Sequence, residues 1–122
     1  MKTLLVAIVA VWVLTAPAAA QNVDLTGDWV FEVKTDFGTG SPTFAFKQEG
    51  EKLTGTYKGV LGEAPVQGTV SGKTFRFSFT GRAQGNEVAV TYDGEAETSD
   101  SVKGRLDLGG MGSGTFTGKR KK

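Results

Sequence analysis

The chain has 122 residues and a formal net charge of +1, which suits a single domain and gives little charge-driven attraction to nucleic acid or membranes. It contains no cysteine and no histidine, which excludes disulfide frameworks, thiol nucleophiles, Ser-His-Asp triads and zinc sites built on those residues. Glycine, with 18 residues, has about twice its usual share.

Residues 1–20 have the features of a cleaved secretory signal peptide. Lys2 provides a positive charge, an apolar run of 11 residues follows at 4–14, and three alanines end at Ala20. A helix of that length spans about 16 Å, too short for a bilayer core of about 30 Å, which argues against a transmembrane anchor. We therefore predict a signal-peptide helix at 1–20, cleavage near Ala20, and a single mature domain at 21–122 that is periplasmic or extracellular.

The charges of the predicted mature domain are unevenly distributed. Within residues 21–122, 13 Lys and Arg balance 13 Asp and Glu, and four of the cations form a run at 119–122, so the rest has a net charge of −4. The basic tail could contact an anionic envelope surface. Four charges without an amphipathic helix predict weak, salt-sensitive binding, so a solvated terminus is the simpler interpretation.

Apolar and polar residues alternate along the chain after Asp24, with the period of a β-strand. No segment beyond the signal peptide has helical periodicity. The sequence predicts eight strands, at residues 29–34, 43–47, 52–57, 64–70, 74–79, 88–92, 102–108 and 114–118.

The segments between these strands are short and rich in turn-forming residues. None could hold a crossover helix, so consecutive strands must be antiparallel neighbours. An eight-stranded meander with one apolar face buries that face most simply by closing on itself. The sequence therefore predicts an all-β fold, a small eight-stranded antiparallel up-and-down barrel, with a two-sheet sandwich as the alternative. The connections are expected at 36–40, 49–51, 59–62, 71–73, 81–86, 93–100 and 109–113.

Glycine and aromatic residues share the inward face of the predicted strands. The pattern apolar-x-Gly-x-apolar centres on Gly55, Gly68 and Gly104, with a partial copy at Gly114. An inward glycine lets a strand bend sharply and leaves room for a ring from across the barrel, and the alternative is that it lines a cavity. Because such a barrel is only just wide enough for side chains, we expect a filled or nearly filled interior. Its aromatic members are Trp29, Phe31, Phe44, Phe46, Tyr57, Phe75, Phe77, Phe79, Tyr92 and Phe116.

The Gly-x-Trp motif at 27–29 resembles the first strand of the calycin barrels, which include lipocalins, fatty-acid-binding proteins and avidins. The residues around it, and Leu-Thr-Gly-Thr-Tyr at 53–57, are similar to the first and third strands of avidins. In calycins a basic residue late in the last strand packs over that tryptophan, a role that the resemblance gives to Arg120, or else to Lys119. The structural signature that it implies is Gly27, Trp29 and Arg120.

The chain also departs from these relatives. Avidins hold biotin with several further tryptophans, whereas residues 21–122 contain only Trp29, so biotin is not an expected ligand. The helical lid segment of fatty-acid-binding proteins is missing. The chain as a whole most resembles an uncharacterised group of small glycine-rich secreted bacterial proteins, with a Gly-x-Trp start and a glycine-rich ending like that at 109–116. This resemblance implies an architecture and no activity.

Two sets of acidic residues are candidates for chemistry. One set shares a predicted connection and could bind Ca²⁺ through oxygen atoms, although its spacing is not that of an EF-hand and a solvated hairpin is the simpler interpretation. Its members are Asp93, Glu95, Glu97 and Asp100. Carboxylate pairs of the kind that hydrolyse glycosides could form among Asp24, Asp28, Glu63 and Glu87, most of which fall in turns or at strand ends.

The sequence favours a non-enzymatic, secreted or periplasmic binding or interaction module with an envelope partner or a small apolar ligand. One alternative is a carrier of a small apolar ligand in the barrel lumen, and a weaker one is a hydrolase that uses acids alone. We expect no cofactor, no metal, no nucleic-acid partner and no stable membrane insertion, since charges on the outward face argue against an outer-membrane barrel. The residues expected at the lumen mouth are Phe37, Tyr57, Tyr92 and Phe116.

Overall fold

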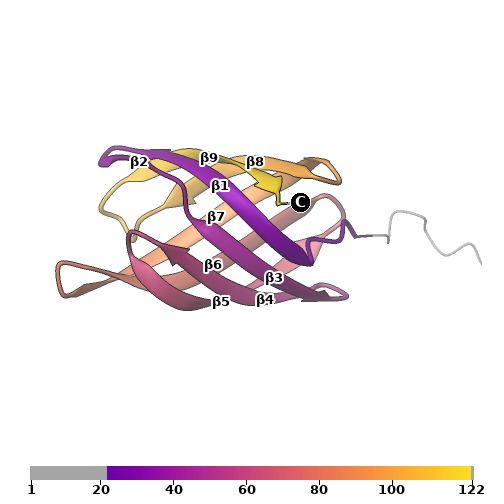
Figure 1. The fold of residues 1–122 in the computed structure, drawn as a ribbon, viewed down its shortest axis with the longest axis horizontal. Helices are drawn as coiled ribbons and strands as arrows, with labels where there is room; N and C mark the ends of the chain where they lie inside the picture. The colour runs from indigo at the N-terminus through magenta and orange to yellow at the C-terminus, as the bar shows by residue number, and fades with distance from the viewer. Residues whose placement is uncertain (1–21, 122) are drawn as a thin grey trace, which may run out of the picture.

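The computed structural model describes residues 22–121, and the predicted signal-peptide helix at 1–20 lies outside the described residues. The described chain consists of strands joined by short turns (Figure 1), and no helix in it is long and apolar enough to cross a membrane. The strands are β1 (Gly27–Thr35), β2 (Gly38–Gly40), β3 (Thr43–Glu49), β4 (Lys52–Gly59), β5 (Gly62–Ser71), β6 (Thr74–Ala83), β7 (Asn86–Thr98), β8 (Ser101–Asp107) and β9 (Ser113–Arg120).

The sheet closes into a barrel because its first strand pairs with its last. β1 runs antiparallel to β9, with Trp29 opposite Arg120, and every strand from β3 to β9 pairs with the next in sequence. β2 and β3 both pair with β1 and act as one strand with a break at 41–42. The predicted eight-stranded antiparallel barrel is confirmed, and the sandwich alternative is wrong.

Aromatic rings fill most of the interior. All ten aromatic residues that the strand period placed inward are buried, as predicted. Their rings contact one another: Phe31 stacks on Phe116 with 5.1 Å between ring centroids, and Phe77 stacks on Tyr92 at 4.8 Å. Buried rings of this size remove about 150–250 Å² each from water, so they dominate the energetics of the core.

Glycines on the inward face make this packing possible. Gly94 of β7 lies opposite Gly104 of β8. A side chain at Gly104 would collide with the backbone of β7, and one at Gly94 would collide with the rings of Phe75 and Phe116. Both predicted reasons for an inward glycine, a close backbone approach and room for a ring, therefore apply at this pair.

The expected connection at 93–100 is mostly strand. β7 continues to Thr98, and only residues 99–100 separate it from β8. The period of two persists through this segment, but its inward positions hold the small residues Gly94 and Ala96, so the apolar signal is weak. Likewise, β6 and β7 continue to a turn at Gln84 and Gly85, whose φ angles of 52° and 82° suit a tight hairpin.

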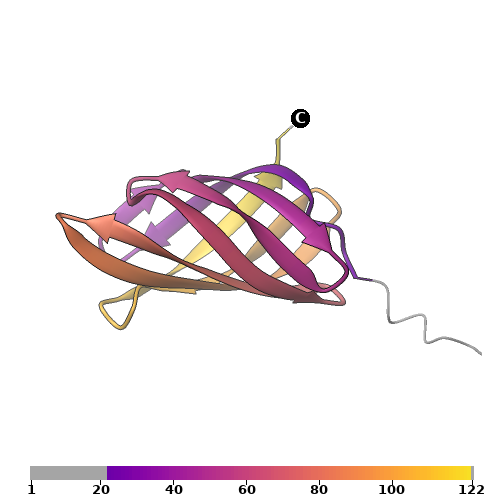
Figure 2. The ribbon, with the colours of Figure 1, turned by 90° about the horizontal axis from the view of Figure 1, so that it is seen from below.

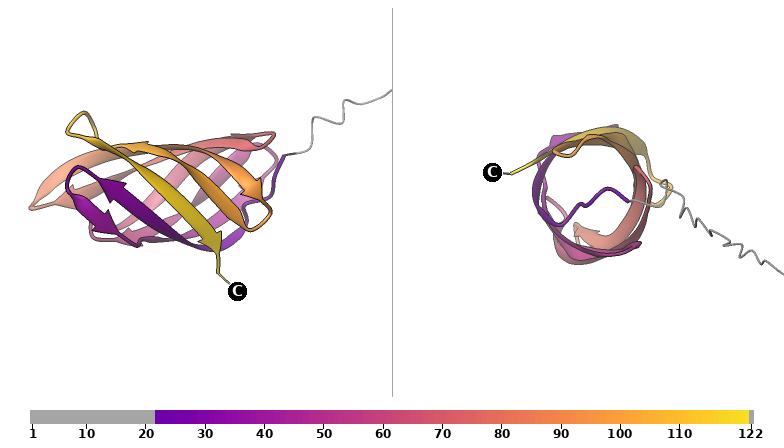
Figure 3. Two further views of the ribbon diagram at one scale, coloured as in Figure 1. Left: turned by 90° about the horizontal axis from the view of Figure 1, so that it is seen from above. Right: turned by 90° about the vertical axis from the view of Figure 1, so that its right-hand side faces the viewer.

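The two ends of the barrel differ. The β3–β4, β5–β6 and β7–β8 turns lie at one end, and the segment 22–26, which we call the strap, crosses it (Figure 3, right). We call this the closed end. The β1–β2, β4–β5, β6–β7 and β8–β9 turns form the opposite end, where the β6–β7 hairpin projects beyond its neighbours (Figure 2).

Candidate functional site

A cavity of about 710 Å³ enters the barrel opposite the closed end, and we call this the open end. All four turns of the open end contribute to its wall, and inward residues of the strands, among them Val33, Val90 and Leu106, line its deeper part. The aromatic cluster fills the barrel below it. The expectation of a nearly filled interior therefore holds for most of the barrel, with one end left open.

Large apolar side chains are exposed at the rim of this cavity. Phe37, Val60 and Met111 are 68%, 86% and 58% exposed, and they are the large hydrophobic side chains that remain exposed in residues 22–121. All three line the cavity although they come from three different turns. Single exposed apolar residues are ordinary, whereas a cluster of them around a cavity marks a place where another molecule binds.

Two tyrosines lie deeper in the cavity. Tyr57 of β4 and Tyr92 of β7 are 3% and 2% exposed, and both line the cavity. The ring of Tyr57 stacks on Phe79 with 4.1 Å between centroids. Its hydroxyl oxygen accepts a hydrogen bond of 3.2 Å from the backbone N–H of Leu61, which fixes the β4–β5 turn against the barrel wall.

The cavity carries no formal charge. No Asp, Glu, Lys or Arg of the described chain lines it. Burial raises the pKa of the Tyr57 phenol, and burial together with the neighbouring Tyr57 raises the pKa of Tyr92 further. Both phenols are therefore neutral at ordinary pH. A charged group that entered this site would lose its hydration without gaining a counterion.

The structure brings together three of the four residues expected at the lumen mouth. Phe116 is the exception: it is buried in the packed interior and does not line the cavity. The prediction for Phe116 is wrong because the residue lies in the middle of β9, opposite Gly104, where Gly94 leaves space for its ring to stack on Phe31. The three that do line the cavity are Phe37, Tyr57 and Tyr92.

Val60 and Met111 also line the cavity, and neither was predicted from the sequence. Each is a large apolar residue within a glycine-rich turn, at 59–62 and 109–112. Because a side chain in a tight turn at the end of a barrel has few neighbours to cover it, this combination was a usable signal for an exposed apolar rim.

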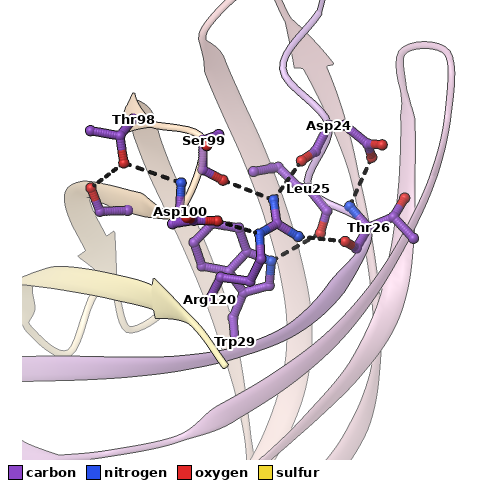
Figure 4. A network of polar contacts seen from close by, with 9 residues as sticks. Asp24, Leu25, Thr26, Trp29, Thr98, Ser99, Asp100 and Arg120 are labelled. Atoms are coloured by element: carbon purple, nitrogen blue, oxygen red, sulfur yellow. Dashed lines mark hydrogen bonds and ion pairs between the residues drawn. The ribbon is translucent and has the colours of Figure 1, made fainter. Parts of the chain in front are cut away.

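Arg120 holds the closed end together (Figure 4). Its guanidinium carbon lies 4.6 Å from the centroid of the Trp29 ring, so the cation over the indole is that of Arg120 and not of Lys119. Its Nε donates to a carboxylate oxygen of Asp100 at 3.0 Å. Its terminal nitrogens donate, over 2.6 to 2.9 Å, to the backbone carbonyls of Asp24, Thr26 and Ser99. One side chain thus links β9, the strap and the β7–β8 turn.

Gly27 and Trp29 allow the strap to pack closely against Arg120. Gly27 has a φ of 131°, and a Cβ at this position would lie 3.0 Å from Nη1 of Arg120. The indole N–H of Trp29 donates to the backbone carbonyl of Leu25 at 3.0 Å. Hydrogen bonds from Thr26 lower the pKa of the Asp24 carboxyl beside it. The polar groups of the described residues at this end therefore bind one another.

The acids considered for hydrolysis lie at two opposite ends of the barrel, and none of them faces the cavity. Asp28 is the second residue of β1 at the closed end, close in sequence to Asp24 of the strap. Glu63 lies 3.7 Å from Lys58, and its side chain is 65% exposed at the outer surface of the open end. None of these acids, nor Glu87, lines the cavity. The geometry offers no carboxylate pair for acid–base chemistry around a bound molecule.

The acidic residues of 93–100 bind basic side chains instead of forming an ion site. Asp93 contacts Arg76 at 2.9 Å and Glu97 contacts Lys103 at 3.3 Å. Because β7 continues through this segment, Asp93, Glu95 and Glu97 alternate along the outer face of a strand and do not surround a common point. No group of three potential metal ligands is found within residues 22–121.

A second hollow, of about 750 Å³, lies on the outer face of the barrel over the bend at Gly94 and Gly104. It is more open to solvent than the cavity at the open end. Arg76 and Asp93, which line it, already form an ion pair with each other. Exposed ion pairs of this kind contribute little and do not define a ligand site.

Comparison with known proteins supports the fold alone. The chain matches no protein-family model and no curated protein. It is similar in structure to a redesigned β-barrel, with a TM-score of 0.66 and 18% sequence identity over 80% of this chain and 92% of that one. At this level of identity the match shows the barrel architecture and carries no information about a ligand.

Proposed function

We propose that this chain is a non-catalytic binding protein that takes a small apolar molecule into the open end of its barrel. The observation that carries the proposal is the uncharged cavity of about 710 Å³ with Phe37, Val60 and Met111 exposed around it. Ligand sites in proteins have volumes of roughly 300–1,000 Å³ and walls that are mostly apolar.

The energetics agree with this proposal. Apolar surface that leaves water contributes about 25 cal/mol per Å², so a ligand that covers the rim and fills the cavity gains free energy without any charged contact. The deeper walls are strands of a closed sheet, so this part of the site is formed before binding and needs little ordering. The predicted signal peptide and the calycin-like motif at 27–29 suit an exported binding protein, and both stay predictions.

The test is a fluorescence titration of the purified protein with N-phenyl-1-naphthylamine, an uncharged dye that becomes bright in apolar surroundings. We expect saturable binding at micromolar protein. A variant with Val60→Glu and Met111→Glu places two charges at the rim, and we expect it to bind the dye at least about tenfold more weakly, which corresponds to about 1.4 kcal/mol.

The matched control is the double variant Gln67→Glu with Thr69→Glu, which adds the same two charges on the exposed outer face of β5, away from the cavity. This control should bind the dye as the unaltered protein does. The proposal is overturned if no dye binds at micromolar protein, or if the double rim variant binds as tightly as the control.

A further inference from the structure

The two tyrosine hydroxyls in the cavity point to a more specific ligand class. We propose that the cavity takes a neutral molecule that carries a hydrogen-bond acceptor, such as a carbonyl oxygen, on an apolar body, and that Tyr57 and Tyr92 donate their hydroxyl protons to this acceptor. This inference rests on the proposed function of the open end. It assigns the inner part of the site to polar recognition and the rim to apolar contact.

The distribution of aromatic residues is the first observation. The chain has two tyrosines, and both line the cavity. The phenylalanines that fill the rest of the interior do not line it. Phenylalanine and tyrosine rings have the same shape, so packing alone does not explain why the hydroxyl-bearing residues are the two at the cavity.

The hydroxyl of Tyr92 is the second observation. The residue is 2% exposed, and its hydroxyl has no hydrogen-bond partner among residues 22–121. A buried hydroxyl without a partner is costly and uncommon in proteins, and where one occurs at a ligand cavity the missing partner is supplied by the ligand or by water.

The hydroxyl of Tyr57 accepts one hydrogen bond and donates none within the described chain. Its oxygen accepts the bond from the Leu61 N–H, and a phenol still has one proton to donate. No described residue takes that proton. Gly59 leaves the space around this oxygen free, because a Cβ there would collide with the Tyr57 hydroxyl. The hydroxyl groups of Tyr57 and Tyr92 are therefore two donors at one cavity, and no acceptor from the described chain binds their protons.

Because no charged residue of the described chain lines the cavity, ligands with a neutral acceptor should bind better than ions. A carboxylate or an ammonium group would enter without a counterion from the described chain, whereas a ketone, ester or ether oxygen needs only the donors that are present. The other polar lining side chains, such as Ser41 and Gln84, are exposed at the rim and already solvated.

The experiment compares four probes with the same nine-carbon chain, each used to displace N-phenyl-1-naphthylamine: 2-nonanone, nonane, nonanoate and nonylammonium. In the unaltered protein the ketone should bind more tightly than either ion. In Tyr92→Phe, and separately in Tyr57→Phe, the ratio of ketone affinity to nonane affinity should fall about fivefold, which is the effect of one neutral hydrogen bond. Ser78→Ala, which removes a hydroxyl from the exposed outer face of β6 away from the cavity, is the control and should leave this ratio unchanged.

A second readout reports on the phenols directly. The ketone should perturb the near-ultraviolet absorption of tyrosine, and nonane should not. The inference is overturned if both Tyr→Phe variants keep the ratio of the unaltered protein, or if nonanoate binds more tightly than 2-nonanone. If nonane and the ketone both bind but neither variant changes the ratio, the proposed function stands and only this inference fails. If the dye does not bind at all, the proposed function itself fails.

Discussion

The closed end and the open end of the barrel are built from the same strands and handle their exposed groups in opposite ways. At the closed end Arg120 uses its donors on Asp100 and on three backbone carbonyls while it covers the Trp29 ring. At the open end Phe37, Val60 and Met111 stay exposed, and two buried hydroxyls have protons without an acceptor from the described chain.

This difference separates stability from binding. An end whose polar groups are satisfied within the chain adds to the free energy of folding and offers little to a ligand. An end that leaves apolar surface and donors unpaired gives up stability, and a bound molecule can restore it. Substitutions at the closed end should therefore change unfolding, and substitutions at the open end should change binding.

The largest effect on stability is expected for Trp29→Ala. The side chain is fully buried at the closed end, and truncation of a large buried ring costs about 3–5 kcal/mol. Urea unfolding followed by circular dichroism would measure the loss, with Trp29→Phe as a milder control. A loss below about 1 kcal/mol would show that the closed end is not the stabilising end.

A smaller loss, about 2 kcal/mol, is expected for Arg120→Met, because it removes the cation over the indole and four hydrogen bonds while the apolar length is kept. Lys119→Met removes the same charge from an exposed neighbour and should change stability by less than about 0.5 kcal/mol. Affinity for the dye should be unchanged in both. If Arg120→Met weakens dye binding without loss of stability, the division of roles between the ends is wrong.

The dependence of folding stability on alkaline pH tests whether the two tyrosines of the open end are buried. Burial raises the pKa of Tyr57 and Tyr92 above the value of about 10 in an unfolded chain. Folding stability is therefore full below pH 10 and falls as the pH rises beyond it, by about 1.4 kcal/mol per pH unit for each phenol that stays neutral in the fold.

Spectrophotometric titration beside circular dichroism measures this dependence. Phenolate absorption should rise only above pH 10, and as the circular dichroism of the fold is lost. Tyr92→Phe should weaken the dependence of stability on pH. Phenolate that forms near pH 10 in a protein that is still folded would mean that the hydroxyls are not buried.

The smallest effect on stability is expected for Val60→Ser. The side chain is 86% exposed, so its replacement should change the free energy of unfolding by less than about 0.5 kcal/mol. The same change removes apolar surface from the rim and should weaken dye binding measurably. Equal dye affinity in Val60→Ser, Phe37→Ser and the unaltered protein would show that the rim does not take part in dye binding.

Strand period predicted the barrel and its aromatic interior because inward residues such as Phe75, Phe77 and Phe79 alternate without interruption. The predicted strand at 88–92, which corresponds to β7, ended too early because Gly94 and Ala96 occupy inward positions with little apolar surface. Small side chains are a weak sequence signal even where the hydrogen-bonded ladder continues.

The site was harder to predict than the fold. Tyr57 and Tyr92 followed from the inward period, whereas their position relative to the cavity depends on which end of the barrel stays open. Phe116 has the same inward period, and it lies in the packed interior because it is in the middle of β9 and Gly94 of β7 makes room for its ring. The rim depends on how four turns meet in space, a long-range property that local patterns do not contain.

Backbone amide chemical shifts, measured by NMR during a titration with 2-nonanone, test the central claim most directly. We predict that the shifts that change fall in the turns of the open end, at 36–42, 59–62, 83–85 and 108–112, and around Tyr57 and Tyr92. The amides of the strap and of residues 99–100 at the closed end should not move. Changes confined to the closed end or to the outer face of β6–β9, or no changes at saturating ketone, would contradict the account.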